Sequence, residues 1–295
     1  MRAEYAPTAN PVNEPTAGTP RTSAVVLTLI LAAYTFARVL EVVPIRVPSL
    51  VIVALNVLSS LAFAVVDGAR HYRLRGILVF AAICALVGNI AENLSISTGF
   101  PFGHYYFTGL MGPKLFQVPV LLGLAYIGMA YISWTLARQI AGHATNLLTV
   151  PITASFIMVA WDFAQDPVWG TVLHGWVWID GGPWFGVPIS NYFGWYATIF
   201  VIYLLFALYI RRNRQAQSAM GHGVTARPAI VFYALCAIGN VLEILRHPDP
   251  AVVQDPSGQS WRVADITAAS ALVSIFVMGA FAVFAWTGHS RPATD

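Results

Sequence analysis

Three acidic residues stand at the ends of long apolar runs and could carry out proton chemistry. Asp162 and Asp166 lie in the segment AWDFAQDP, and Glu92 lies in GNIAEN. Asp162 and Asp166 are four residues apart, which places both carboxyl groups on one face of a helix. Two carboxyl groups this close in apolar surroundings rarely ionise together, so one retains a proton that it can donate. We therefore expect Asp162, Asp166 and Glu92 to be catalytic.

Two other acids have a basic residue three positions away. Arg38 precedes Glu41, and Arg246 follows Glu243. Residues at this spacing meet on one helix face, so we expect Glu41 to form a structural ion pair with Arg38. For Glu243, pairing with Arg246 and a functional role both remain open.

The runs that contain Glu92 and Glu243 resemble each other. The sequence CALVGNIAE at 84–92 matches CAIGNVLE at 236–243 with one residue deleted. Internal repeats are common in membrane proteins, so an ancient duplication is one hypothesis. Chance similarity between apolar helices is the other.

Several kinds of chemistry lack their sequence signatures. The seven histidines include no H-x-x-x-H pair, which argues against a membrane di-iron enzyme. There is no glycine-rich nucleotide loop, no D-D-x-x-D run for magnesium diphosphate and no signature of a serine nucleophile. Cys84 and Cys236 lie alone in apolar runs, as small core residues do. We expect acid–base chemistry that uses no metal and no cofactor.

The composition requires lipid around these residues. Of the 295 residues, 57% are hydrophobic and 10% are charged, whereas soluble domains carry about 25% charged residues. The net charge of +3 is small and its basic residues are scattered, so we expect no nucleic-acid partner. A chain this poor in charge cannot cover a surface that faces water, and the lipid bilayer is its expected surrounding.

Apolar segments of about 20 residues predict the membrane-spanning helices. We expect an all-α fold, a polytopic membrane bundle of about eight transmembrane helices with two aromatic-rich lid loops. The domain boundaries predicted are a disordered tail at 1–22, a transmembrane domain at 23–287 and a C-terminal tail at 288–295. The predicted spans are 24–43, 50–67, 76–94, 117–137, 146–163, 192–210, 228–245 and 264–286.

The basic residues predict the orientation. With eight spans, one side carries eleven Lys and Arg residues and the other side carries four. Positive loops favour the cytoplasm, so both termini are expected there. We expect an integral protein of the cytoplasmic membrane of a prokaryote.

Both long loops fall on the side with few charges. They are 95–117 and 164–191, and each is rich in Gly, Pro and aromatic residues. Such aromatics often form a belt at the membrane interface. Loops this apolar would not lie freely in water, so we expect both to fold back over the bundle as lids.

The segments around the acids resemble a known family. They are ENLSISTGFPFGHYYFT, GPKLFQVP, WDFAQDP and GWVWIDGGPWFGVPISNYFGW, all within residues 88–198. This set looks like the membrane carotenoid hydratases, which include the bisanhydrobacterioruberin hydratases and the carotenoid 1',2'-hydratases. Gln165 and Tyr192 depart from that family's pattern, but neither removes an ionisable group. The resemblance implies a lipophilic carotenoid substrate, with other enzymes of the carotenoid pathway as candidate partners.

Hydration of a terminal (ψ-end) double bond would use these residues together. A carboxylic acid protonates the alkene, aromatic faces stabilise the tertiary carbocation, and a positioned water captures it. Asn191 and Asn93 are candidates for holding the water, although core or interfacial packing is the simpler interpretation of each aromatic. The candidate substrate-binding residues are Tyr105, Tyr106, Trp161, Trp169, Trp176, Trp178, Trp184, Asn191, Trp195 and Asn93.

We therefore expect a carotenoid hydratase, a cofactor-independent hydro-lyase of the 1,2-hydratase type. Two alternatives remain open. A carotenoid end-group cyclase or isomerase would use the same protonation but capture the cation internally. A membrane transporter or lipid-binding protein would use the acids as a proton relay.

Overall fold

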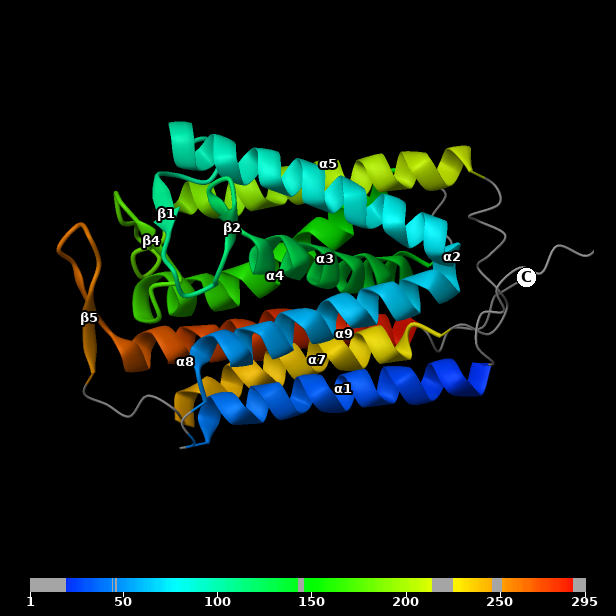
Figure 1. Cartoon of the computed structure of the whole chain (residues 1–295), viewed down its shortest axis with the longest axis horizontal. Coiled ribbons are helices and arrows are strands. Elements are labelled where there is room, and N and C mark those ends of the chain that lie inside the picture. Colours follow the sequence, from blue (N-terminus) through cyan, green and yellow to red (C-terminus); the bar gives the residue numbers. More distant parts are fainter. Residues whose placement is uncertain are drawn as a thin grey trace, which may run out of the picture.

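The protein is a bundle of long helices that run side by side (Figure 1). The computed structural model describes residues 20–43, 45, 47–142, 146–213, 225–245 and 251–288. The predicted all-α fold is confirmed within these ranges. The main helices are α1 (Pro20–Val42), α2 (Ser49–Thr98), α3 (Val120–Ala141), α4 (Thr149–Pro167), α5 (Ile189–Arg212), α7 (Arg227–Leu242), α8 (Val263–Val273) and α9 (Gly279–Gly288).

Helix α2 consists of two arms that reverse direction. Arg73 has non-helical angles, φ 59° and ψ 167°, inside the 50-residue element. Figure 1 shows the two arms meeting at one end of the bundle and running in opposite directions. The arms pack closely at this turn, because a Cβ on Gly68 would lie 2.6 Å from the Ile77 side chain. The predicted spans 50–67 and 76–94 are these two arms, joined by a turn much shorter than the predicted loop.

Six helical segments among the described residues are long and apolar enough to span a membrane. The two arms of α2 count as one of these segments, and α4 is not among them. An integral membrane protein follows from these segments, while the count of eight spans stays a prediction. Helix α4 is less apolar because it carries Asp162 and Asp166 within its last turns.

The chain ends of the bundle differ slightly from the prediction. Helix α1 begins at Pro20, so the last three residues of the predicted tail 1–22 are helical, and α9 ends at Gly288. Residues 1–19 and 289–295 lie outside the described residues.

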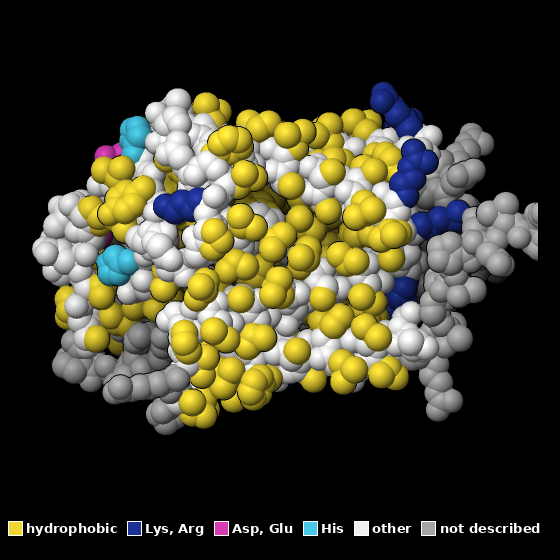
Figure 2. All heavy atoms as spheres, viewed as in Figure 1, with side chains coloured by type: hydrophobic (Ala, Val, Ile, Leu, Met, Phe, Trp, Pro, Cys, Tyr) yellow, Lys and Arg dark blue, Asp and Glu magenta, His cyan; other side chains and the backbone are white. Residues whose placement is uncertain are grey.

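Apolar side chains cover the middle of the face in Figure 2, and basic side chains gather mainly at the end where α1 begins. This distribution is consistent with the predicted orientation, which stays a prediction.

The six short strands found among the described residues lie at the opposite end of the bundle, which we call the strand end. β1 (Tyr105–Phe107) pairs antiparallel with β4 (Trp176–Trp178), which joins the two long aromatic loops. The other strands form two local hairpins, β2 (Lys114–Leu115) with β3 (Val118–Pro119), and β5 (Val252–Gln254) with β6 (Ser260–Arg262). We call the strands and loops at this end the cap, while the predicted action of the two long loops as lids stays a prediction.

Hydrogen bonds to Asp255 stabilise the hairpin of β5 and β6. The Asp255 carboxyl accepts hydrogen bonds from the Ser257 hydroxyl, the Trp261 indole and the Gln259 backbone. Burial alone would raise the pKa of Asp255, but these donors together hold it below its usual value. The hairpin also reaches the loop before α5, where the Phe185 and Trp261 rings lie 5.3 Å apart.

The core centres on α3, which packs against α2, α4, α7 and α9. Its Ser133 and Thr135 side chains are buried too, and the Tyr203 hydroxyl of α5 donates to the Ala130 carbonyl of α3. Close approach of α2 and α3 depends on Gly128, because a Cβ there would lie 2.8 Å from the Ser60 carbonyl carbon. Small residues at such crossings let membrane helices pack by direct backbone contact.

Gly128→Ala should therefore destabilise the bundle by roughly 1–3 kcal/mol, the usual effect of overpacking. Thermal unfolding of the purified protein in detergent measures the change. The matched control is Gly123→Ala in the same helix, where a new Cβ meets nothing within 4 Å. This control should be neutral, or stabilising by up to about 1 kcal/mol through helix propensity. Equal stability of the two variants would contradict the assigned crossing.

Candidate active site

The three acids predicted to be catalytic line one cavity at the strand end. Glu92 comes from the second arm of α2, while Asp162 and Asp166 come from the last turns of α4. All three are buried, with exposed fractions of 3%, 5% and 1%. We call this space the acid cavity. Its lining residues are Glu92, Phe102, Tyr105, Phe107, Leu122, Asp162, Asp166, Trp176, Trp178, Asn191 and Trp195.

One amide joins the two aspartates. The Asn191 Nδ2 of α5 donates to Asp166 Oδ2 at 2.5 Å and to Asp162 Oδ2 at 3.2 Å. Both carboxyl groups therefore converge on a single side chain, as their spacing along α4 predicts. Asn191 is 1% exposed, so water does not screen the two groups from each other.

The two aspartates differ in the donors that they receive. Asp166 Oδ1 also accepts the indole N–H groups of Trp176 at 2.7 Å and Trp178 at 3.2 Å. Hydrogen bonds from N–H groups favour the ionised carboxylate. Asp166 therefore has three such donors, whereas among the described residues Asp162 receives only the longer bond from Asn191. The negative charge of the pair is best placed on Asp166.

Glu92 is held by two phenols. The Tyr126 hydroxyl of α3 donates to Glu92 Oε1 at 2.5 Å, and the Tyr105 hydroxyl of β1 donates to Oε2. Burial raises the pKa of the Tyr105 phenol well above its usual range, and the adjacent Glu92 charge raises it further. Tyr105 therefore stays protonated and acts only as a donor to the carboxyl group.

Strand pairing places the aromatic cover over the acids. Tyr105 lies opposite Trp178 in the β1–β4 pair, and their rings are 4.7 Å apart. Successive side chains of a strand point to opposite faces, so Tyr105 and Phe107 face the cavity while Tyr106 is 51% exposed. The preceding loop is fixed on α5, because a Cβ on Gly194 would lie 2.7 Å from the Pro101 carbonyl oxygen.

Phe102 is held at the cavity by backbone contacts on both sides. Its N–H donates to the Ser95 hydroxyl at 3.0 Å, and its carbonyl accepts the Ser190 hydroxyl at 2.9 Å. Helix α2 ends next to this loop at Gly99, whose φ of 78° favours glycine. The end of α2 and the start of α5 therefore fix the loop between them.

The structure brings most, but not all, of the predicted residues to the acid cavity. Trp161 and Trp169 border a neighbouring cavity instead, although Trp169 stacks on Trp176 at 6.1 Å. Three predicted residues lie elsewhere, and their role in substrate binding stays a prediction. Tyr106 faces outward, Trp184 stacks on Phe163 at 4.5 Å, and Asn93 bonds to Asn89 and the Gln117 backbone. The predicted residues at the cavity are Glu92, Tyr105, Asp162, Asp166, Trp176, Trp178, Asn191 and Trp195.

Sequence reasoning missed Tyr126, which is the second donor to Glu92. Its ring also stacks on Trp195 at 4.5 Å with an interplanar angle of 12°. A tyrosine in the middle of an apolar helix needs a partner for its hydroxyl, and this requirement was the available signal. The apolar cavity residues Phe102, Phe107 and Leu122 were also missed, and their types alone do not distinguish them from core residues.

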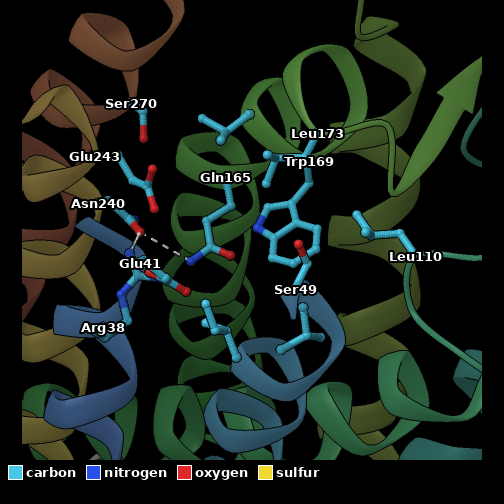
Figure 3. A pocket seen from close by; sticks show the side chains of 13 residues that line it. Arg38, Glu41, Ser49, Leu110, Gln165, Trp169, Leu173, Asn240, Glu243 and Ser270 are labelled. Atoms are coloured by element: carbon cyan, nitrogen blue, oxygen red, sulfur yellow. Dashed lines mark hydrogen bonds and ion pairs between the residues drawn. The ribbon is translucent and has the colours of Figure 1, made fainter. Parts of the chain in front are cut away.

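A second space, the polar cavity, adjoins the acid cavity on another face of α4. Two connected hollows form it, and both are lined by Arg38, Glu41 and Gln165. One of the two hollows, which is also lined by Asn56 and Trp161, shares Leu122 and Trp176 with the acid cavity. Figure 3 shows its polar side chains converging from α1, α4, α7 and α8.

The polar cavity contains the predicted Arg38–Glu41 ion pair, at 2.8 Å. Arg38 also donates to Asn240 Oδ1 at 3.0 Å, and Gln165 donates to the same oxygen at 3.2 Å. Glu243 lines this cavity, whereas its predicted partner Arg246 lies outside the described residues. Glu92 and Glu243, the matching acids of the possible repeat, therefore border different cavities.

No group of three or more His, Cys, Asp and Glu side chains suited to a metal ion occurs among the described residues. The predicted absence of a metal and of a cofactor stays a prediction.

One family model matches the chain over residues 46–253, and its description is carotenoid biosynthesis protein. This match covers well over half of the 295 residues. The chain belongs to the carotenoid biosynthesis protein family. No curated protein and no solved structure matches it.

Family membership supports the predicted resemblance at its broader level, carotenoid biosynthesis. Every residue that lines the acid cavity lies within the matched segment. In contrast, the polar cavity takes Arg38, Glu41 and Ser270 from helices outside it. The acid cavity is thus built entirely from the part of the chain that carries the family pattern.

Tyr126→Phe tests the hydrogen bond from Tyr126 to Glu92, because the substitution removes the hydroxyl and keeps the ring. We expect a loss of about 1.5–3 kcal/mol in stability, typical of a hydrogen bond to a charged group. Thermal or denaturant unfolding in detergent provides the measurement. Tyr106→Phe is the matched control, since Tyr106 is 51% exposed and should tolerate the change. A stable Tyr126→Phe protein would argue against a charged Glu92 held by this phenol.

Proposed function

We propose that this member of the carotenoid biosynthesis family is a carotenoid hydratase, which adds water across a terminal (ψ-end) double bond. The observation that carries the proposal is the acid cavity itself. It combines three buried carboxyl groups with several aromatic faces, and it lies in a membrane-helix bundle of a carotenoid-pathway family. Alkene hydration needs an acid, a stabilised cation and a base beside water.

Asp162 is the proposed proton donor. Two adjacent carboxyl groups in one dry site share a single negative charge more easily than they carry two. The three N–H donors on Asp166 place that charge there, which leaves the proton with Asp162. Asp166 then acts as a positioning residue, since its charge and the Asn191 amide orient Asp162.

The aromatic lining is the proposed support for the carbocation. Protonation of the less substituted alkene carbon leaves positive charge on the tertiary carbon. The rings of Trp178, Trp195 and Tyr105 line the cavity, and indole faces attract cations most strongly among aromatic rings. Both Trp178 and Trp195 are buried, which strengthens this electrostatic attraction.

Glu92 is the proposed base for the attacking water, and the polar cavity is the proposed source of that water. The polar cavity borders the acid cavity at Leu122 and Trp176. Two buried polar atoms on its wall, Arg38 Nε and Asn56 Oδ1, have no hydrogen-bond partner among the described residues. Buried polar groups are normally satisfied, so ordered water is the expected occupant.

The proposed reaction balances without a cofactor. The alkene π electrons form a C–H bond with the Asp162 proton, and the water oxygen forms a C–O bond with the tertiary cation. Glu92 takes the proton that the bound water loses, and this proton returns to Asp162 before the next cycle. The net change is the addition of one water molecule to the polyene.

Expression in cells that make lycopene or γ-carotene tests the reaction directly. We expect pigments whose mass increases by one water per reacted end, measured by liquid chromatography and mass spectrometry. An altered pigment of unchanged mass would support an end-group cyclase or isomerase instead. Unaltered pigment, with folded protein present in the membrane, would contradict the hydratase function. A transporter or lipid-binding protein would then be the remaining candidate.

Asp162→Asn should lower conversion by about 10²–10⁴-fold, the usual contribution of a general acid. Asp166→Asn should also reduce conversion, because it removes the charge that holds the Asp162 proton in place. Asp180→Asn is the matched control, since this carboxyl lies in the same cap and its side chain is 68% exposed. Pigment analysis at equal amounts of folded protein gives the rates. Full activity in Asp162→Asn would exclude Asp162 as the donor.

A further inference from the structure

The acid cavity is too small for a whole carotenoid. Its volume is about 20 Å³, close to the roughly 10–15 Å³ that one water molecule needs. If the proposed function holds, only the reacting end of the polyene reaches the acids here. The remaining hydrocarbon chain must then lie along another surface that reaches the acids.

A lateral groove between the second arm of α2 and the start of α3 reaches Glu92 from outside the acid cavity. Glu92 lines both spaces, and Tyr126, its hydrogen-bond partner, lines the groove beside it. Nearly all other lining residues are apolar. The groove is lined by Cys84, Ala85, Gly88, Asn89, Glu92, Leu115, Val118, Pro119, Val120, Gly123, Leu124, Tyr126 and Ile127.

Small residues create the space in this groove. A Cβ added to Gly123 would meet nothing within 4 Å, and one on Gly88 would only touch the Tyr126 ring at 3.6 Å. Ala85 and Val120, on opposite walls, are both exposed. The groove therefore opens on the apolar side of the bundle, where hydrocarbon is the surrounding solvent of a membrane protein.

The polar cavity is the other space beside the acids, but its walls do not suit a hydrocarbon chain. It contains the buried Arg38–Glu41 ion pair together with Gln165 and Asn56. A hydrocarbon there would displace water from Arg38 Nε and Asn56 Oδ1, which have no hydrogen-bond partner among the described residues. Leaving such groups buried and unsatisfied costs several kcal/mol.

We propose that the lateral groove binds the hydrocarbon chain of a linear polyene while its end lies among the acids. This inference rests on the proposed function for the reacting end. It adds a membrane-facing binding site, formed by α2 and α3, in which small residues leave room for an apolar chain.

Filling the groove tests this site. Gly123→Leu and Ala85→Leu, made separately, each place a larger side chain in the groove from a different helix. We expect at least roughly tenfold less total polyene pigment, substrate plus product, per purified protein, because about 50 Å² of lost apolar contact corresponds to that change in affinity. Absorbance of protein purified from pigment-producing cells gives the ratio, and size-exclusion chromatography confirms the folded state.

Two further variants make the test decisive. Ala82→Leu is the matched control, because Ala82 is exposed on the same arm of α2 and does not line the groove, so pigment should remain. Val57→Trp instead fills the hollow of the polar cavity that adjoins the acid cavity, and pigment should again remain. Pigment retained in both groove variants but lost in Val57→Trp would overturn the proposal.

The pigment ratio does not depend on catalysis, so the two proposals fail in different ways. Bound but unconverted pigment in the unsubstituted protein would contradict the hydratase alone. Hydrated pigment formed at a normal rate by folded Gly123→Leu and Ala85→Leu proteins would contradict the groove alone.

Discussion

The cost of burying carboxyl groups in an apolar bundle governs the organisation of the strand end. Glu92, Asp162 and Asp166 are nearly inaccessible to solvent, and a carboxylate at membrane depth costs several kcal/mol unless it is paired or hydrogen-bonded. The protein supplies no basic partner among the residues that line the acid cavity. Neutral donors replace it, namely one amide, two indoles and two phenols. The charge is stabilised without being neutralised, which leaves the carboxyl groups able to exchange protons.

Helix α4 separates two spaces of different character. Asp162 and Asp166 lie on the stripe that faces the acid cavity, while Gln165 and Trp169, also four residues apart, face the polar cavity. Because neighbouring stripes of one helix are only a few ångströms apart, the acidic, aromatic and amide side chains of this segment lie close together. This arrangement brings a dry space and a polar space into contact at Trp176 and Leu122.

Apolar length and residue spacing predicted much of this arrangement. The helix positions followed from runs of about 20 apolar residues, and the convergence of Asp162 with Asp166 followed from their four-residue spacing. The sequence did not reveal the sharp turn at Arg73, because a single residue with non-helical angles leaves no pattern in composition. It also did not reveal Tyr126, since a hydroxyl finds its partner through the packing of α2 on α3. The sequence also did not show that Trp184, Tyr106 and Asn93 lie away from the acid cavity, because residue type does not specify the direction in which a side chain points.

The three-residue pairing of β1 with β4 has a consequence for how such chains can vary in length. Side chains alternate along a strand, so a shift of one residue would turn Tyr105 away from Glu92 and bring Tyr106 in its place. A single insertion or deletion between Glu92 and Tyr105 would therefore exchange the inward and outward members of the strand. Changes in length at this point are tolerable only in steps of two residues, which keep the same side chains facing the acids.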